Sequence, residues 1–297
     1  MAKTYTSAKP RVACEIASDR VIAGRLAETG GMLDTCVSQD LAPGSVVPDL
    51  IESNLRQRDS VFQALRNTLG TVSGRSRDLI AILPDAAVRV VLLDFETLPA
   101  NREEAEGVVR FRLKKSLPFD VDKAKVSYQS QTSTTGLRVI AAVALNTVVD
   151  DYESVFREAG YSPGIVIPST LAALGVAEAS SPTLVVKVDS RTTSIAIMDK
   201  QQLLLFRTLE NARGSAITGE RLAEEIYPSV VFFQDTYHMN IDRIFVAGVP
   251  DLGAAAPALR AQTGAEVEEL VGSSQLGAKA ASVPKWRTAG VLGALLS

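Results

Sequence analysis

The chain has 297 residues, more than a typical single domain, and its 46% hydrophobic content is enough to build the cores of two domains. A formal net charge of −3 gives no reason to expect nucleic-acid binding, and two cysteines with one histidine are too few for a conventional zinc site. Because no signal-peptide core and no apolar run of ~20 residues occurs, we expect a cytoplasmic protein without direct membrane insertion.

The first half begins with three closely spaced strands, predicted over 11–16, 21–26 and 32–37. A helix over 50–69 follows, with Asp49 as its cap, an apolar face toward a core and Gly70 at its end. A short apolar run predicts a buried strand over 78–83, which Pro84 ends.

The second half repeats this order of elements. Strands are predicted over 184–188, 194–198 and 203–207, then a helix over 215–238 that Pro228 should kink or split, then a buried strand over 243–247. A helix near 252–263, a short strand near 266–268 and an apolar terminal helix complete the chain. Two β-β-β-α-β units on one chain resemble the plan of the actin-like, sugar-kinase and Hsp70 ATPase superfamily.

Residues 89–165, between the two halves, do not follow this plan. They read as a strand, a helix over 102–116, strands over 124–129 and 137–145, a helix over 149–159 and a strand over 164–167. In the first helix Asn101 is the expected cap and Glu104 stands in capping-box position. Acidic residues crowd its first turn, basic residues its last, and Pro118 ends it. The segment is therefore a compact α+β insertion.

The helix stop Leu117-Pro118-Phe119-Asp120, followed by a strand ending in Tyr128-Gln129, is similar to the signature segment of the PilM family. These are actin-like cytoplasmic proteins of type IV pilus assembly. The resemblance implies an actin-like (RNase H-like) α/β fold of duplicated βββαβα domains with an inserted 1C-type subdomain. It divides the chain into a subdomain 1A over 1–88, closed by a helix over 284–297, an insertion over 89–168 and a second actin-like domain over 169–283.

The resemblance also implies a partner. It predicts a non-enzymatic adaptor that binds the N-terminal peptide of a PilN-like inner-membrane protein in a groove between 1A and the insertion. Through that partner, the adaptor would be located peripherally at the inner membrane. Pilus motor or platform proteins and further copies of the chain are additional expected partners. The candidate walls of the groove are apolar: Val90, Val91, Leu92, Leu93, Phe111, Leu113 and Leu117. Arg110 and Lys114 are the candidate rim. The apolar members could equally form the core of the insertion.

In the actin-like superfamily, two hairpin turns hold the phosphates of ATP and carboxylates hold Mg²⁺ through water. Here Glu15 and Ala17 replace the aspartate and glycine of the first turn, and Lys187 and Asp189 replace those of the second. A carboxylate at the phosphate approach repels an anion, and a lysine cannot bind Mg²⁺. We therefore expect ATP binding to be weakened or lost. The residues that would retain it are Ser18, Lys187, Thr192, Thr193 and Gly248.

Two other functions are compatible with the same fold class. A small-molecule kinase or ATPase needs intact phosphate turns and a catalytic acid or base, and both turns depart from the pattern. A polymer former similar to FtsA would end in an amphipathic membrane helix, and the terminal helix here lacks the basic face of such a helix. The sequence therefore favours the peptide-binding adaptor.

Overall fold

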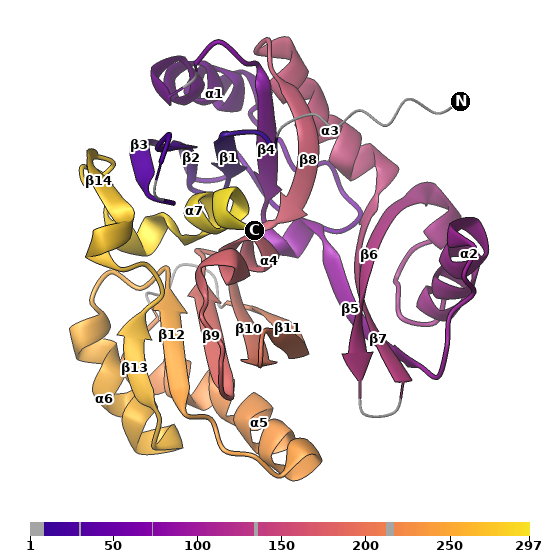
Figure 1. The fold of residues 1–297 in the computed structure, drawn as a ribbon. Helices are drawn as coiled ribbons and strands as arrows, with labels where there is room; N and C mark the ends of the chain where they lie inside the picture. Colours follow the sequence, from indigo (N-terminus) through magenta and orange to yellow (C-terminus); the bar gives the residue numbers. More distant parts are fainter. Residues whose placement is uncertain (1–8, 30, 73, 134–135, 212–216) are drawn as a thin grey trace.

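The computed structural model describes residues 9–29, 31–72, 74–133, 136–211 and 217–297. It consists of two α/β lobes, one above the other, and a small subdomain beside them (Figure 1). Each lobe is built on one sheet, and the small subdomain has a sheet of its own.

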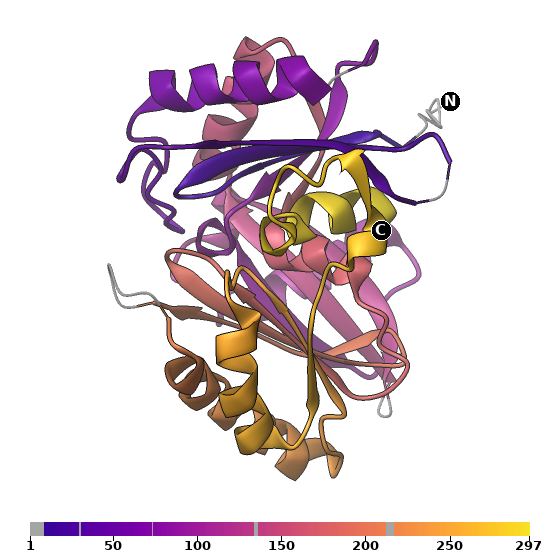
Figure 2. The same cartoon turned by 90° about the vertical axis from the view of Figure 1, so that its left-hand side faces the viewer.

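The first lobe is built on a six-stranded sheet of order β14-β3-β2-β1-β4-β8. β1, β2 and β3 form an antiparallel meander, whereas β4 runs parallel to β1 and β8 parallel to β4. The strands are β1 (Val12–Ile16), β2 (Arg20–Leu26), β3 (Leu33–Asp40), β4 (Asp78–Leu83), β8 (Ser162–Pro168) and β14 (Leu276–Lys279). Helices α1 (Arg58–Val72) and α3 (Asn146–Glu158) cover one face of this sheet, and α7 (Ala289–Leu296) covers the other (Figure 2).

The second lobe is built on a five-stranded sheet of order β11-β10-β9-β12-β13. Its strands are β9 (Thr183–Val188), β10 (Thr192–Asp199), β11 (Gln202–Glu210), β12 (Arg243–Ala247) and β13 (Glu266–Glu269). Helices α5 (Gly219–Tyr237) and α6 (Leu252–Thr263) pack on its outer face. The short α4 (Ser169–Ala173) packs against α7 in an apolar core shared by the two lobes.

The small subdomain has a three-stranded antiparallel sheet of order β5-β7-β6 with one helix on its outer face. Its elements are β5 (Arg89–Phe95), α2 (Arg102–Leu113), β6 (Ala124–Ser133) and β7 (Gly136–Leu145). Asn101 caps α2 as predicted, because its side-chain oxygen accepts from the backbone N–H groups of Glu103 and Glu104.

The start of α1 differs from the prediction by eight residues. The Asp49 carboxylate accepts from the backbone N–H groups of Ile51 and Glu52, as a cap would, but it closes an isolated turn. The buried Asn54 side chain then donates to the carbonyls of Asp49 and Glu52, which keeps this segment out of the helix. The helix also continues past Gly70 to its last residue, Val72.

Strand pairing and helix packing place two of the predicted segments. β8 pairs with β4 in the first sheet and α3 packs against α1, so the small sheet and its helix take up residues 89–145 of the insertion predicted over 89–168. Pro228 lies inside a single helix, α5, so the predicted split does not occur, and the predicted kink stays a prediction. Positions 215 and 216 of the predicted helix lie outside the described residues.

Candidate functional site

The hairpin turn after β1 and the hairpin turn after β9, which occupy the positions of phosphate-binding turns, contact each other directly. The hydroxyls of Ser18, after β1, and Ser190, after β9, are hydrogen bonded across the lobes. Arg20 at the start of β2 forms an ion pair with Asp19 at 2.8 Å and lies 3.5 Å from Asp189 of the opposite turn. Protein groups of opposite charge therefore join the two turns.

A buried cation lies behind these turns. The Lys187 ammonium donates to an Asp189 carboxylate oxygen at 2.6 Å and lies 3.5 Å from a Glu15 oxygen. Glu15 also accepts from the hydroxyl of Ser169 on α4. Burial alone would lower the pKa of Lys187, but the charges of Asp189, Glu15 and Asp85 outweigh burial and raise that pKa above its ordinary value. Lys187 is therefore cationic at neutral pH.

Asp189 is the anionic centre of the cluster. Burial would raise its pKa, but the charges of Lys187 and Arg20 hold it below the ordinary value. One carboxylate oxygen of Glu15 and one of Asp189 are buried and accept no hydrogen bond among the described residues. An incoming phosphate would meet these carboxylates as well as the cations, which opposes anion binding.

Asp85, two residues after the end of β4, is a site residue that sequence reasoning missed. It is buried and accepts from the backbone N–H of Thr170 at 2.9 Å, from the Thr170 hydroxyl at 2.5 Å and from the Ser194 hydroxyl at 2.9 Å. Burial raises its pKa despite the nearby charge of Lys187. The only sequence signal was an acidic residue that follows a buried strand and its Pro84 stop. Asp85 therefore links both lobes to α4.

The other residues predicted to retain ATP have structural roles. The Thr193 hydroxyl donates to Asn211 at 2.7 Å, and Thr192 is buried beside it. Gly248 has φ +83°, a conformation that favours glycine, and a Cβ there would lie 1.7 Å from the Val188 carbonyl oxygen. This close packing against β9 accounts for the glycine without a nucleotide.

An apolar cleft of about 170 Å³ lies between the first lobe and the small subdomain. β8 forms one wall, and the face of the small sheet opposite α2 forms another. Most of its lining side chains are small or apolar: Leu83, Val88, Val126, Ser127, Ala142, Ala144, Val149, Val166, Ile167 and Pro168. Lys125 and Glu153, which form an ion pair with each other at 3.3 Å, also line it.

None of the predicted groove residues lines this cleft. Val91 and Leu93 lie on the face of β5 that α2 covers, in one core with Leu113 and the half-buried Leu117. Phe111 is 69% exposed on the outer face of α2. At the rim, Arg110 is paired with Glu106 and Lys114 with Asp122. The alternating residues Val90 and Leu92 lie on the other face of β5, because strand side chains alternate.

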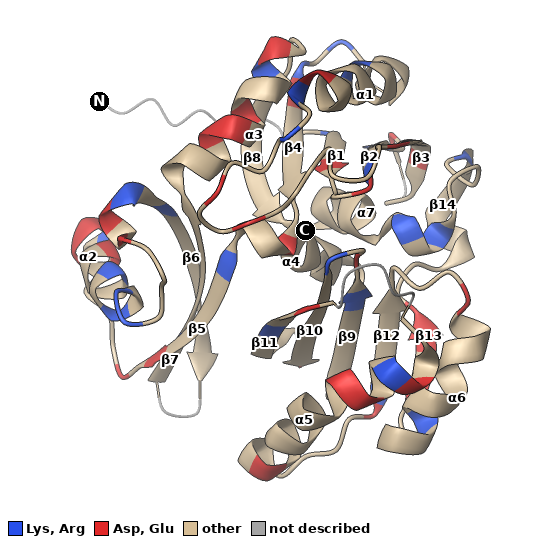
Figure 3. Ribbon diagram, turned by 180° about the vertical axis from the view of Figure 1, so that it is seen from behind, with Lys and Arg blue, Asp and Glu red and all other residues tan. Residues whose placement is uncertain are grey.

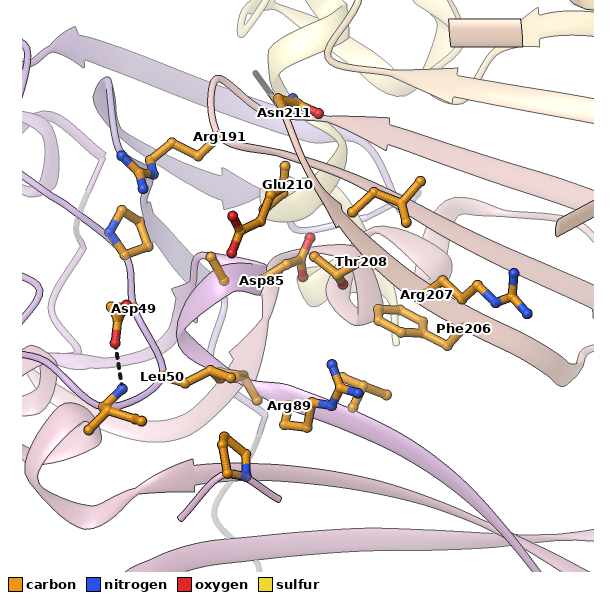
Figure 4. A pocket seen from close by; sticks show the side chains of 18 of the residues that line it. Asp49, Leu50, Asp85, Arg89, Arg191, Phe206, Arg207, Thr208, Glu210 and Asn211 are labelled. Carbon is orange, nitrogen blue, oxygen red and sulfur yellow. Dashed lines mark hydrogen bonds between the residues drawn. The ribbon is translucent and has the colours of Figure 1, made fainter. Parts of the chain in front are cut away.

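A second cavity, of about 530 Å³, lies between the loop at 48–51, the start of β5 and the end of β11 (Figure 4). Arg89, Arg191, Asp49 and Glu210 line it, so both signs of charge are present. The dashed line in Figure 4 is the Asp49 turn described above. An extended apolar peptide fits the chemistry of the apolar cleft better than that of this polar cavity.

The fold is an actin-like α/β fold with an inserted α+β subdomain, as predicted. One chain of a structure described as a PilM–PilN type IV pilus biogenesis complex matches it with a TM-score of 0.80 and 17% identity, covering 97% of this chain and 98% of that one. The cytoplasmic domain of EpsL, an inner-membrane component of the type II secretion system of Vibrio cholerae, matches with a TM-score of 0.53 and 9% identity over 96% and 92% of the two chains.

The ethanolamine utilization protein EutJ from Carboxydothermus hydrogenoformans matches with a TM-score of 0.54 and 10% identity over 96% and 89% of the two chains. No family model and no curated protein matches the sequence. Across the described part of the chain, the helices are all too short or too polar to cross a membrane. The similarity therefore lies in the fold, and it extends over nearly the whole chain.

Proposed function

We propose that this chain is a PilM-like adaptor of a type IV pilus or related secretion platform, which binds the cytoplasmic N-terminal peptide of a PilN-like membrane protein. The observation that carries the proposal is the apolar cleft beside an unpaired strand edge, in a chain with the fold of a protein from a PilM–PilN complex. A cytoplasmic location at the inner membrane, through that partner, belongs to the same proposal.

The free edge of β8 supports binding by strand addition. Within the described part of the chain, β8 pairs with β4 on one side only and is the last strand of its sheet. Edge strands are usually protected by charge, whereas Ile165 on β8 is apolar and 42% exposed. An extended peptide would pair with this edge through its backbone and place alternate side chains in the cleft. The small side chains of Ala142 and Ala144 leave the space for them.

The adaptor would need no nucleotide to hold its lobes together. Glu15 on β1 faces Lys187 on β9, and Arg20 on β2 faces Asp189 after β9, so charged contacts already bridge the two sheets. In actin-like relatives a metal-bound nucleotide lies between such turns. The internal pairs therefore support a non-enzymatic protein whose peptide affinity is independent of ATP.

The test is a titration of the purified protein with the fluorescently labelled N-terminal peptide of a PilN-like protein, followed by anisotropy, with and without ATP and Mg²⁺. We expect saturable micromolar binding that ATP does not change. A peptide with alternate backbone nitrogens methylated should bind about tenfold more weakly, because it cannot complete the strand pairing. ATP-dependent affinity or clear ATP turnover would contradict the proposal.

A matched pair of variants locates the binding site. Ser127 is exposed, lines the cleft and lies opposite Ala142 on the inner face of the small sheet. Ser130, on the same strand, is exposed on the other face, opposite Val139. Ser127→Trp should fill the cleft and abolish binding, whereas Ser130→Trp should not. Equal affinity of the two variants would exclude this cleft.

A further inference from the structure

The inner face of the small sheet, opposite α2, meets two different parts of the molecule. At one end of this face, Ser127, Ala142 and Ala144 line the apolar cleft beside the first lobe. Farther along the strands, Leu92 and Ile140 pack against the apolar core that the two lobes share. Figures 1 and 3 show the small sheet beside β11 of the second lobe, and β5 and β11 are in contact. The small sheet therefore contacts both lobes.

A side-chain amide of the small sheet pairs with the backbone of β11. The Gln131 amide nitrogen donates to the Leu203 carbonyl at 2.7 Å, and the Gln131 amide oxygen accepts from the Leu203 backbone N–H at 3.1 Å. These two bonds satisfy one donor and one acceptor on β11, as a neighbouring strand would. Gln131 therefore joins the small subdomain to the second lobe.

Arg138, opposite Gln131 on β7, makes a second connection to the same lobe. Its guanidinium donates to the Tyr237 hydroxyl on α5 at 2.8 Å and to the Leu204 carbonyl on β11 at 3.4 Å. The Asp94 carboxylate on β5 accepts from the same guanidinium at 2.7 Å and 3.1 Å, which fixes its direction. Gln131 and Arg138 are called the latch.

The opposite end of the small subdomain is joined to the first lobe. The chain enters the small subdomain at 88–89, after the buried Asp85, and leaves it at 145–146, directly before α3. Both crossings lie at the apolar cleft, because Val88 and Ala144 line it. Hinge motions are absorbed by a few residues at the ends of elements. Rotation at these two crossings would therefore change the distance between the small sheet and β8.

We propose that the small subdomain is a lid over the apolar cleft, hinged at 88–89 and 145–146 and held closed by the latch. The closed cleft of about 170 Å³ is smaller than the roughly 300–1,000 Å³ of ordinary ligand pockets, so it holds few side chains. Release of the latch widens the cleft. This inference rests on the proposed function and adds its regulation: the peptide binds the open form, and the latch lowers its apparent affinity by keeping most molecules closed.

Distances between paired spin labels test the lid in the absence of peptide. One label is attached through Ser130→Cys, on the other face of the small sheet, and one through Glu224→Cys on α5; both positions are exposed. The two native cysteines are buried and do not compete for the label. A second pair, through Thr71→Cys on α1 and Glu224→Cys, reports on the two lobes alone.

Replacing Gln131 with glutamate opens the latch. Gln131→Glu keeps the size of the side chain but removes the donor to the Leu203 carbonyl. A longer distance between Ser130 and Glu224 should therefore appear beside the wild-type distance. The ratio of open to closed molecules should rise about fivefold, in line with the modest net contribution of a hydrogen bond. The distance between the labels on the two lobes should not change.

Two further variants separate the latch from a general loss of packing. Tyr237→Phe keeps the ring but removes the hydroxyl that accepts from Arg138 and donates to β11, so it should also add the longer distance. Gln129→Ala changes an exposed side chain on the same strand and the same face, and should leave the distances unchanged. Identical distances in the wild type and Gln131→Glu, or a longer distance in Gln129→Ala, would overturn the proposal.

Anisotropy with the fluorescently labelled N-terminal peptide separates the lid from the proposed function. Gln131→Glu should bind this peptide about fivefold more tightly than the wild type, and Gln129→Ala should bind it equally. If no variant binds the peptide but the label distance lengthens as expected, the adaptor proposal fails and the lid stands. If the peptide binds but the distances do not respond, the lid fails and the adaptor stands. An opened variant that binds the peptide no more tightly than the wild type would refute control of the cleft by the latch.

Discussion

Replacing Lys187 with methionine measures what the buried charge cluster contributes. The substitution keeps the apolar stem but removes the ammonium that lies 2.6 Å from Asp189 and 3.5 Å from Glu15. Removing one partner of a buried ion pair costs about 3–5 kcal/mol, because the remaining charge has no compensation. Arg20 still lies 3.5 Å from Asp189, so the cost falls mainly on Glu15. We therefore expect Lys187→Met to lower the unfolding free energy by about 3 kcal/mol, the lower end of this range.

The assay is urea unfolding at pH 7, followed by the fluorescence of Trp286, the single tryptophan. Trp286 reports on the second lobe close to the cluster, because its carbonyl accepts from the backbone N–H of Gly248 at 2.9 Å. Arg221→Met, which removes an exposed ion pair with Glu225, is the control and should cost no more than about 0.5 kcal/mol.

A double variant identifies the cause. Lys187→Met combined with Glu15→Gln removes the stranded carboxylate together with its partner, and should recover at least about 1 kcal/mol of the loss. A single variant within about 1 kcal/mol of the wild type would refute the reasoning. So would a double variant that is less stable than the single one.

Three further predictions follow from local geometry. In thermal unfolding, Gly248→Ala should destabilise the protein by at least about 2 kcal/mol more than Gly264→Ala. Both glycines have positive φ, but only at Gly248 would the added Cβ lie 1.7 Å from a carbonyl oxygen. Equal losses of stability in the two variants would contradict this. Tyr152→Phe removes a buried hydrogen bond of 3.0 Å to Asn54 and should lower the unfolding free energy by about 1 kcal/mol in urea; a variant as stable as the wild type would contradict this. The pKa of Asp189 is lower in the folded state than in the unfolded state. Its contribution to the unfolding free energy is therefore fully present above the unfolded-state pKa and is lost as pH falls through the folded-state pKa. Below about pH 4 the unfolding free energy should fall more steeply for the wild type than for Asp189→Asn, and parallel curves would refute the assignment.

Local sequence signals predicted individual elements well. The apolar runs at β4 and β12 are strands, and the charge order of α2 with its Asn101 cap marks a helix, because these signals act within one turn or one strand. The same local logic failed at Asp49. Its carboxylate caps a turn, and the side chain of Asn54, whose oxygen accepts from Tyr152 on α3, holds the chain away from helical geometry.

The location of the cleft could not be derived from the sequence. Strand periodicity separates Val90 and Leu92 from Val91 and Leu93, but it does not say which face a helix covers. Likewise, the short apolar run of β8 predicts a strand but does not say whether that strand belongs to the insertion or to the first sheet. Its place beside β4 depends on backbone hydrogen bonds between strands separated by a whole subdomain.

By itself the sequence determined the order of elements, the duplicated plan and the departure of both hairpin turns from a phosphate-binding pattern, since Glu15, Lys187 and Asp189 are visible as residue types. Only the tertiary structure decided that these three residues meet, because Glu15 and Lys187 lie on different sheets and their charges are compensated only when the lobes close. The physical reason is the same at the cleft and at the cluster. Burial and long-range pairing select among the chemical options that a local sequence leaves open.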